Sequence, residues 1–292
     1  MIVPLSARGR TVGAITFASA ESGRMFGDAD LELAQDLARR AALAYDNARL
    51  YEERSHIALT LQNTLLPREL PSIDGLEIVP FYQASNISHA DVGGDFYDVF
   101  ATADDAWAVV VGDVCGKGVE AAALTGMARH TLRAAGARGG TPVEALEDLN
   151  RVMIREDGER FCTVAFGRVR SNGHGVHLDV ACGGHPAPLV VRSDGRVETV
   201  GAPGSLLGVF DDVAFEERST LLEPSDLAIF FTDGLIDARA TASLDEAALA
   251  TLVARCAGRT AEGALDVIKA VVADPDASTS DDTCVLVVRV RG

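Results

Sequence analysis

The chain has 292 residues, and 48% hydrophobic with 24% charged residues predict a packed core rather than disorder. Its formal net charge of -17 argues against nucleic acid or an anionic membrane surface as a partner, because both need a basic face. The five cysteines form no Cys-x-x-Cys pair, which disfavours a disulfide framework or structural zinc and indicates a reducing cytoplasm. No apolar run approaches the ~20 residues of a membrane span, and no signal peptide is recognisable.

Residues 1–27 are expected to be the remnant of a sensor domain. Strands at 2–5 and 12–17 flank a turn at 7–10 and predict a hairpin. Two strands cannot form a stable domain by themselves, so we expect further sequence or another chain to cover them. The ending Gly-Ala-Ile-Thr-Phe, followed by a Phe-x-x-x-Asp helix start at Phe26, resembles the last strands and helix of a GAF sensor domain.

A linker helix is predicted over 28–66, where no proline or glycine interrupts the sequence. Three apolar residues follow heptad spacing, namely Leu43, Leu50 and Ile57. This pattern favours a coiled coil that pairs two chains in a homodimer. Asn47 and Arg54 would weaken that seam, so a single amphipathic helix on its own domain is an equal alternative.

The third segment, 67–292, alternates hairpin strands with paired helices. Strands are expected at 76–82, 91–100, 106–113, 161–169, 176–182, 187–192, 213–220, 226–232 and 283–290. Helices are expected at 117–136, 142–155, 243–257 and 260–273. Turns are expected at 172–173 and 194–195. This order favours antiparallel sheets covered by helices over a doubly wound parallel sheet.

Four aspartates stand at strand ends or adjoining turns, namely Asp95, Asp113, Asp233 and Asp282. Any one of them could simply make a turn, but a single site would explain all four. Gathered without cations, their carboxylates would repel one another and raise one another's pKa. A hard divalent cation bound through oxygen, Mn²⁺ or Mg²⁺, is the expected solution.

Two such ions could orient a phosphate and activate a water for in-line attack, so no nucleophilic serine, cysteine or histidine is required. The sequence indeed contains no Gly-x-Ser-x-Gly elbow and no Walker A motif.

Five motifs occur in order over about 60–292, namely 92–98, 112–118, 183–186, 231–235 and 281–283. Together with the lead-in 61–67, they resemble the bacterial SpoIIE/RsbU group of PPM-type, metal-dependent serine/threonine phosphatases. The resemblance implies an α+β fold, in which an antiparallel β-sandwich is flanked by helix pairs on both faces.

The resemblance also implies a role for each aspartate. Asp113 would bridge two metal ions, and the backbone carbonyl of Val114 would bind one of them. Asp233 and Asp282 would complete the other ion's ligands, and Asp95 would act through metal-bound water. The attacking water would be activated by these metals, so Asp113, Asp233 and Asp282 would be catalytic through them.

The implied substrate is a phosphoserine or phosphothreonine on a small anti-anti-sigma (STAS) protein, which regulates a sigma factor through partner switching. Two other functions remain open from the residues alone. The chain could be a binding module that holds a partner without turnover. The same carboxylates could instead support phosphodiesterase or nuclease chemistry, although the net charge of -17 disfavours nucleic acid.

Several neighbours of the motifs have two interpretations each. Cys115 stands where the family usually has serine, and we expect a buried, inert thiol. His185 could be a general acid, but a hydrogen-bonded turn residue is favoured. Lys117 could meet the phosphate or be a solvated charge. Asp98 and Asp281 are expected to lie next to the metal ligands and support them without binding the metal ions themselves.

Overall fold

The computed structural model describes residues 1–19, 23, 25–84, 92–103, 105–156, 160–171, 175–237, 244–272 and 281–292. The turn expected at 172–173 and the first residues of the elements expected at 91–100 and 243–257 lie outside these ranges. The chain divides into two units, Met1–Ala58 and Leu59–Gly292. None of the helices in the described ranges has the length and apolar character needed to cross a bilayer.

The first unit contains the predicted antiparallel hairpin and helix, and the hairpin packs on the helix. Strands β1 (Ile2–Ala7) and β2 (Arg10–Thr16) pair, and helix α1 (Asp28–Leu65) continues into the second unit. Small side chains allow the hairpin to approach the helix closely, since Val3 packs on Ala34 and Ala38. The hairpin turn needs a positive φ at Gly9, which is 78°.

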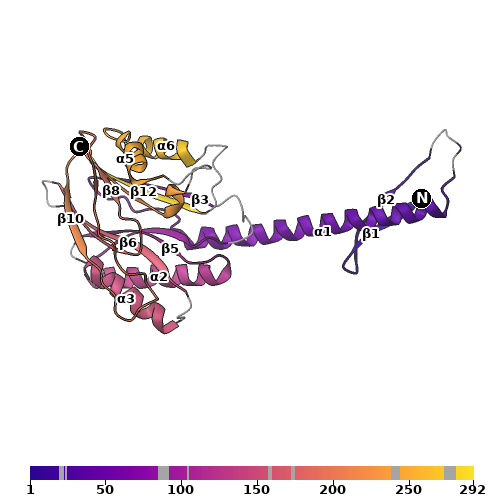
Figure 1. Cartoon of the computed structure of the whole chain (residues 1–292), viewed down its shortest axis with the longest axis horizontal. Coiled ribbons are helices and arrows are strands. Elements are labelled where there is room, and N and C mark those ends of the chain that lie inside the picture. The colour runs from indigo at the N-terminus through magenta and orange to yellow at the C-terminus, as the bar shows by residue number, and fades with distance from the viewer. Residues whose placement is uncertain are drawn as a thin grey trace. The chain divides into compact units, whose positions relative to one another are not determined.

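The second unit contains two five-stranded antiparallel sheets (Figure 1). The strands of the first sheet, in spatial order, are β10 (Glu217–Leu222), β7 (Val176–Gly183), β6 (Cys162–Ser171), β5 (Trp107–Val114) and β4 (Asp95–Ala101). Those of the second are β3 (Leu76–Gln83), β12 (Thr283–Val290), β11 (Leu227–Phe231), β8 (Leu189–Val191) and β9 (Val197–Thr199).

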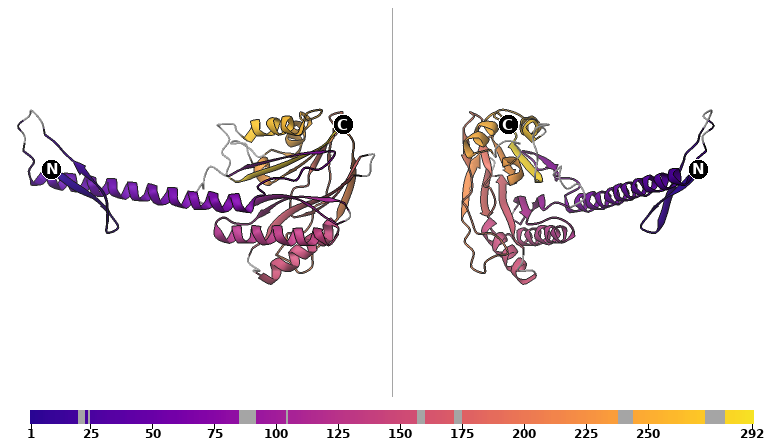
Figure 2. Two further views of the ribbon diagram at one scale, coloured as in Figure 1. Left: turned by 180° about the vertical axis from the view of Figure 1, so that it is seen from behind. Right: turned by 45° about the vertical axis from the view of Figure 1, so that its right-hand side comes forward.

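Helix pairs cover the outer face of each sheet (Figures 1 and 2). Helices α2 (Val119–Ala137) and α3 (Pro142–Glu156) pack on the first sheet, and α5 (Glu246–Ala254) and α6 (Ala261–Val272) on the second. A separate core between the sheets includes Val109, Phe230 and Leu286. This arrangement confirms the predicted α+β sandwich.

Covering both faces of the first sheet explains the apolar sequence of β5. Val109 and Val111 face the second sheet, whereas Ala108 and Val110 face the helices. A strand buried on both sides reads as a continuous apolar run rather than an alternating one. The first polar side chain after this run belongs to Asp113, where the strand reaches the edge of the sandwich.

Several element boundaries differ from the sequence predictions. Strand β4 begins at Asp95, because the backbone of Gly93 and Gly94 packs directly on other segments. Strand β10 covers 217–222 rather than 213–220. Helix α2 begins at 119 rather than 117, since Gly116 and Gly118 have φ values of 105° and 93°. Two short elements went unpredicted, β9 and helix α4 (Asp233–Ile236).

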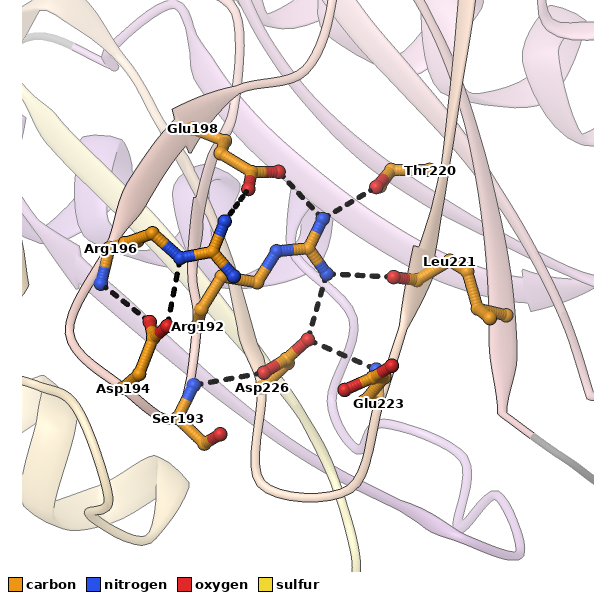
Figure 3. Close-up of polar contacts among 9 residues, drawn as sticks. All are labelled: Arg192, Ser193, Asp194, Arg196, Glu198, Thr220, Leu221, Glu223 and Asp226. Atoms are coloured by element: carbon orange, nitrogen blue, oxygen red, sulfur yellow. Dashed lines mark hydrogen bonds and ion pairs between the residues drawn. The ribbon is translucent and has the colours of Figure 1, made fainter.

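A polar cluster around Arg192 joins the two sheets (Figure 3). The Arg192 guanidinium, following β8, donates to Asp226 Oδ2 at 2.8 Å and to Glu198 Oε2 at 2.6 Å. It also donates to the Leu221 carbonyl at 2.7 Å and the Thr220 hydroxyl at 2.8 Å, both on β10 of the first sheet. These bonds fasten the edge strand β10 to the second sheet.

Candidate metal centre

Asp95 and Asp113 lie side by side on neighbouring strands of the first sheet. The register of β4 and β5 pairs the two residues directly. A Cβ added at Gly94 would lie 2.5 Å from Asp113 Oδ1 and would overlap the Val114 carbonyl oxygen. The Asp113 carboxylate and the Val114 carbonyl, two predicted ligands, therefore border the same glycine. Only glycine leaves room for both oxygens there.

Asp233 and Asp282 adjoin strands of the second sheet, since Asp233 begins α4 after β11 and Asp282 directly precedes β12. Strands β11 and β12 pair Phe231 with Val285, which brings the residues beyond these positions together. A Cβ at Gly234 would overlap the Asp282 carbonyl oxygen. A Cβ at Gly93 would overlap Asp282 Oδ2, so this carboxylate reaches the segment that leads into β4. The structure thus gathers the four predicted aspartates where the two sheets meet.

Two hydroxyl groups hold these carboxylates in place. The Thr232 hydroxyl donates to Asp95 Oδ2 at 2.7 Å and accepts from the Cys284 amide at 2.9 Å. The Tyr82 hydroxyl donates to Asp282 Oδ2 at 3.0 Å. The sequence analysis gave neither residue a role. The position of Thr232 directly before Asp233 could have suggested its role from sequence. The role of Tyr82 could not have been predicted in this way, because it depends on the pairing of β3 with β12.

The carboxylates raise one another's pKa, as expected of negative charges gathered at a partly buried place. Burial, and then the nearby charges of Asp233, Asp281 and Asp282, raise the pKa of Asp113 to about 7. Burial and the Asp113 charge raise the pKa of Asp95 well above its usual range, although the Thr232 hydrogen bond opposes this. Burial and the Asp281 charge raise the pKa of Asp233.

One lysine partly offsets this charge. The Lys117 ammonium lies 3.3 Å from Asp281 Oδ1, and its charge lowers the pKa of Asp113. Lys117 is therefore paired with Asp281, and is not the fully solvated charge that was one of its two interpretations. Asp281 remains half exposed at 49% and holds the Lys117 ammonium at the edge of the aspartate cluster.

The chemistry of these groups fits a hard divalent cation. Carboxylate and carbonyl oxygens are the donors that Mg²⁺ and Mn²⁺ prefer, and a bound cation would oppose both the burial and the neighbouring negative charges that raise the pKa of Asp113. No three carboxylate, imidazole or thiolate groups in the described ranges stand together as a complete ligand set.

His185 is a buried, hydrogen-bonded residue, in agreement with the favoured interpretation. Its Nε2 lies 3.1 Å from the Phe231 carbonyl, which can only accept, so Nε2 carries the proton. Its Nδ1 then accepts from the Thr163 hydroxyl at 2.8 Å. Burial lowers the pKa of His185 to about 3. The neutral imidazole therefore joins β6 of one sheet to β11 of the other.

Two expectations about neighbouring residues are wrong. Asp98 does not support the aspartate cluster, because three residues along β4 its side chain faces the helices instead. There it accepts from Arg129 Nη2 at 2.9 Å and from Arg133 Nη2 at 2.6 Å. Arg129 also donates to the Leu65 carbonyl at the end of α1. Cys115 is half-buried rather than buried, and its thiol is free.

Comparison with known proteins places this geometry in a family. Residues 103–291 match the family described as Stage II sporulation protein E (SpoIIE). Protein IcfG of Synechocystis sp. is 29% identical over 208 residues, which cover 61% of this chain and 32% of IcfG. Phosphoserine phosphatase RsbU of Bacillus subtilis is 27% identical over 185 residues, which cover 63% of this chain and 53% of RsbU. The chain thus spans about half or less of these relatives.

Solved structures share the fold. The RsbU and RsbW domains of Rv1364c from Mycobacterium tuberculosis align with a TM-score of 0.66 and 31% identity, over 76% of this chain and 62% of that one. RsbX in complex with magnesium aligns with a TM-score of 0.57 and 12% identity, over 76% of this chain and 98% of that one. The two sheets with their outer helix pairs define the α+β fold of PPM-type (PP2C) phosphatases. Within that class, the chain belongs to the SpoIIE family.

Proposed function

We propose that this chain is a Mn²⁺- or Mg²⁺-dependent phosphatase that hydrolyses phosphoserine or phosphothreonine on a protein. One observation carries the proposal: two aspartates of the first sheet meet two that adjoin strands of the second at one edge of the sandwich, where burial and the neighbouring charges raise the pKa of Asp113 to about 7. Membership of the SpoIIE family, and similarity to a relative named as a phosphoserine phosphatase, support the choice of reaction.

Each proposed ligand has a role that its position supports. Asp113 would bridge two ions, with the Val114 carbonyl beside it. Asp233 and Asp282 would hold the ion nearer the second sheet, and Asp95 would act through a coordinated water. When bound, such a pair of ions would neutralise the phosphate charge and activate the attacking water. Thr232 and Tyr82 would keep two of the carboxylates oriented through their hydrogen bonds.

The proposed substrate is a phosphorylated STAS-domain anti-anti-sigma protein, and the proposed outcome is release of a sigma factor by partner switching. The support is similarity to RsbU and to a structure that contains RsbU and RsbW domains. Five free cysteines in the described structure suit a reducing cytoplasm, where such partners would be found.

We further propose that residues 1–27 are the end of a GAF-type sensor, 28–66 a linker that pairs two chains, and 67–292 the phosphatase. Leu43 and Ile57 support pairing, because they are 47% and 59% exposed on α1 although they are large and apolar. A signal would then reach the metal centre by repositioning α2 and α3, since Arg129 of α2 bonds both Asp98 of β4 and the Leu65 carbonyl.

The direct test measures phosphate released from a phosphorylated STAS protein with and without Mn²⁺. We expect Mn²⁺-dependent release by the wild-type chain and none by Asp113→Asn or Asp233→Asn, both of which should still fold. Near-wild-type turnover by either variant would refute the metal assignment.

The same assay separates the two alternatives. A binding module would bind the phosphorylated protein and release no phosphate with Mn²⁺ present. A phosphodiesterase would cleave bis(p-nitrophenyl) phosphate faster than a phosphoserine peptide.

A further inference from the structure

Arg160 lies beside the turn that follows Asp113. It precedes β6, and the Cys115 amide donates to the Phe161 carbonyl at 2.9 Å, so the two segments run side by side. Arg160 Nη1 lies 3.5 Å from the Cys115 carbonyl oxygen and 2.6 Å from where a Cβ on Gly116 would stand. The guanidinium therefore covers the open face of a glycine three residues after Asp113.

The guanidinium of Arg160 has N–H donors that its contacts with other described residues do not use. Within the described part of the chain, its contacts are the long bond to Cys115 and a 3.8 Å ion pair with Glu120, whose side chain is 73% exposed. An exposed pair of this length contributes little. By contrast, Arg192 donates at 2.6–2.8 Å to four acceptors, and Asp98 is held by two arginines.

Arg160 also differs from the other cation near the centre. Lys117 lies 3.3 Å from Asp281, so its charge is already committed to a carboxylate. Arg160 is 30% exposed, which leaves it both accessible and partly shielded from water. A planar guanidinium in such a place can bind two oxygens of one phosphoryl group, whereas an ammonium acts as a point charge.

We propose that Arg160 binds the phosphoryl group of the phosphorylated side chain as it enters the metal centre, and exchanges its weak contact with Glu120 for the substrate's oxygens. This inference rests on the proposed phosphatase function. In this role, Arg160 would add a positive charge from the chain itself to the charge that metal ions would supply. The turn at 115–118 would then line the substrate site.

The test compares the wild-type chain with Arg160→Met and Arg160→Lys on a phosphoserine peptide in the presence of Mn²⁺. A charge-assisted bidentate contact predicts a roughly tenfold or larger rise in KM for Arg160→Met, with kcat within about threefold of wild type. Arg160→Lys should lie between the two. Inhibition by inorganic phosphate should weaken by a similar factor. Arg155→Met, which removes an exposed charge from the end of α3, is the matched control and should change neither quantity.

A structural role would give a different result. If Arg160 only braces the turn, Arg160→Met would lower the melting temperature or weaken Mn²⁺ activation while KM and phosphate inhibition stay unchanged, and this would overturn the proposal. If Arg160→Met folds poorly, KM and phosphate inhibition are measured for Arg160→Lys instead, and the same outcomes decide. A result that refutes the proposed phosphatase function can be told apart from one that refutes the role of Arg160. In the first case the wild-type chain, like both Arg160 variants, would release no phosphate with Mn²⁺.

Discussion

Asp113 illustrates how a proposed metal ligand can oppose stability. Its half-buried carboxylate lies near three others, and burial and neighbouring charges raise its pKa to about 7, so above that pH the folded chain holds a charge that its surroundings disfavour. The same electrostatic field would attract a divalent cation. The metal-free chain is therefore expected to be less stable than its apolar packing would allow.

Replacing Asp113 by Asn should reveal this cost. At pH 8, we expect Asp113→Asn to raise the melting temperature of the metal-free chain by roughly 5 °C, which corresponds to about 2 kcal/mol. Added Mn²⁺ should stabilise the wild-type chain further and the variant much less. Differential scanning fluorimetry with EDTA or Mn²⁺ measures both effects. Glu120→Gln serves as the control, because it removes an exposed carboxylate outside the cluster; an equal rise in that variant would contradict the explanation.

His185 should make stability depend on pH in the opposite sense to Asp113. Its pKa is about 3 in the folded chain and about 6.5 when unfolded, so below pH 6.5 the unfolded chain binds the additional proton. The contribution of the neutral imidazole is complete above pH 6.5 and is lost as pH falls toward 3. Asp113, with a raised pKa, instead gains stability as pH falls through about 7.

The His185 contribution is therefore measured as a difference between proteins. The unfolding free energy of His185→Gln relative to wild type should improve by up to ~1.4 kcal/mol for each pH unit between 6 and 4. Urea denaturation at several pH values measures this, and the exposed His130→Gln is the control. Parallel pH curves for wild type and His185→Gln would show that His185 is not neutral in the folded chain.

At the scale of elements, the Arg192 cluster is expected to fasten the edge strand β10. Arg192→Ala should lower the unfolding free energy by about 3 kcal/mol, because it leaves the buried Asp226 carboxylate, only 2% exposed, without its cation. Chemical denaturation checks this. Arg196→Ala removes an exposed neighbour of the same cluster and should leave stability nearly unchanged. Similar losses in both variants would mean that the burial of Asp226 is not what matters.

Helix α1 is the element through which we expect two chains to form a dimer. If its heptad residues pair two chains, Leu43→Glu should convert a dimer to a monomer, since it places a charge in an apolar seam. Leu43→Met retains the apolar side chain and should remain dimeric. Sedimentation of the wild-type chain and both variants would distinguish these results, and a monomeric wild type would refute the pairing.

How well an element could be predicted depended on its length. Long apolar runs such as 107–114 and 283–290 were placed correctly, because burial on both faces leaves a continuous pattern. The three residues of β9 and the four of α4 are too short for any period to show. The loop before β10 reads as strand from 213, but ladder pairing with β7 starts only at 217.

The aspartates could be found from sequence because each stands at or next to an end of an apolar strand. Their partners could not, because these contacts cross between distant segments. Tyr82 and Asp282 are 200 residues apart, and Asp95 and Thr232 are 137 apart. Asp98 was misplaced for a related reason: residues three apart on a strand point to opposite faces, and proximity in sequence to Asp95 concealed this.

At the scale of the whole molecule, the end of α1 belongs to the second unit, which begins at Leu59. Leu66 packs against two of its hydrophobic cores, and the Leu65 carbonyl accepts from Arg129. We expect a protein of residues 59–292 to melt roughly 5 °C above one of residues 67–292, since the shorter one loses about 2 kcal/mol of packing and hydrogen bonding. Equal melting temperatures would place the boundary after the helix.

The central position of β12 in its sheet has a consequence for biosynthesis. This strand is the last in the chain, yet it lies between β3 and β11, and Asp282 directly precedes it. A ribosome therefore supplies two pairings of the second sheet and the fourth aspartate only after it has made the other strands of both sheets. Until then, the growing chain would carry three of the acidic groups without the strand that holds them together. Activity would begin only once β12 has been made, so a product truncated before this strand could not act on the substrate.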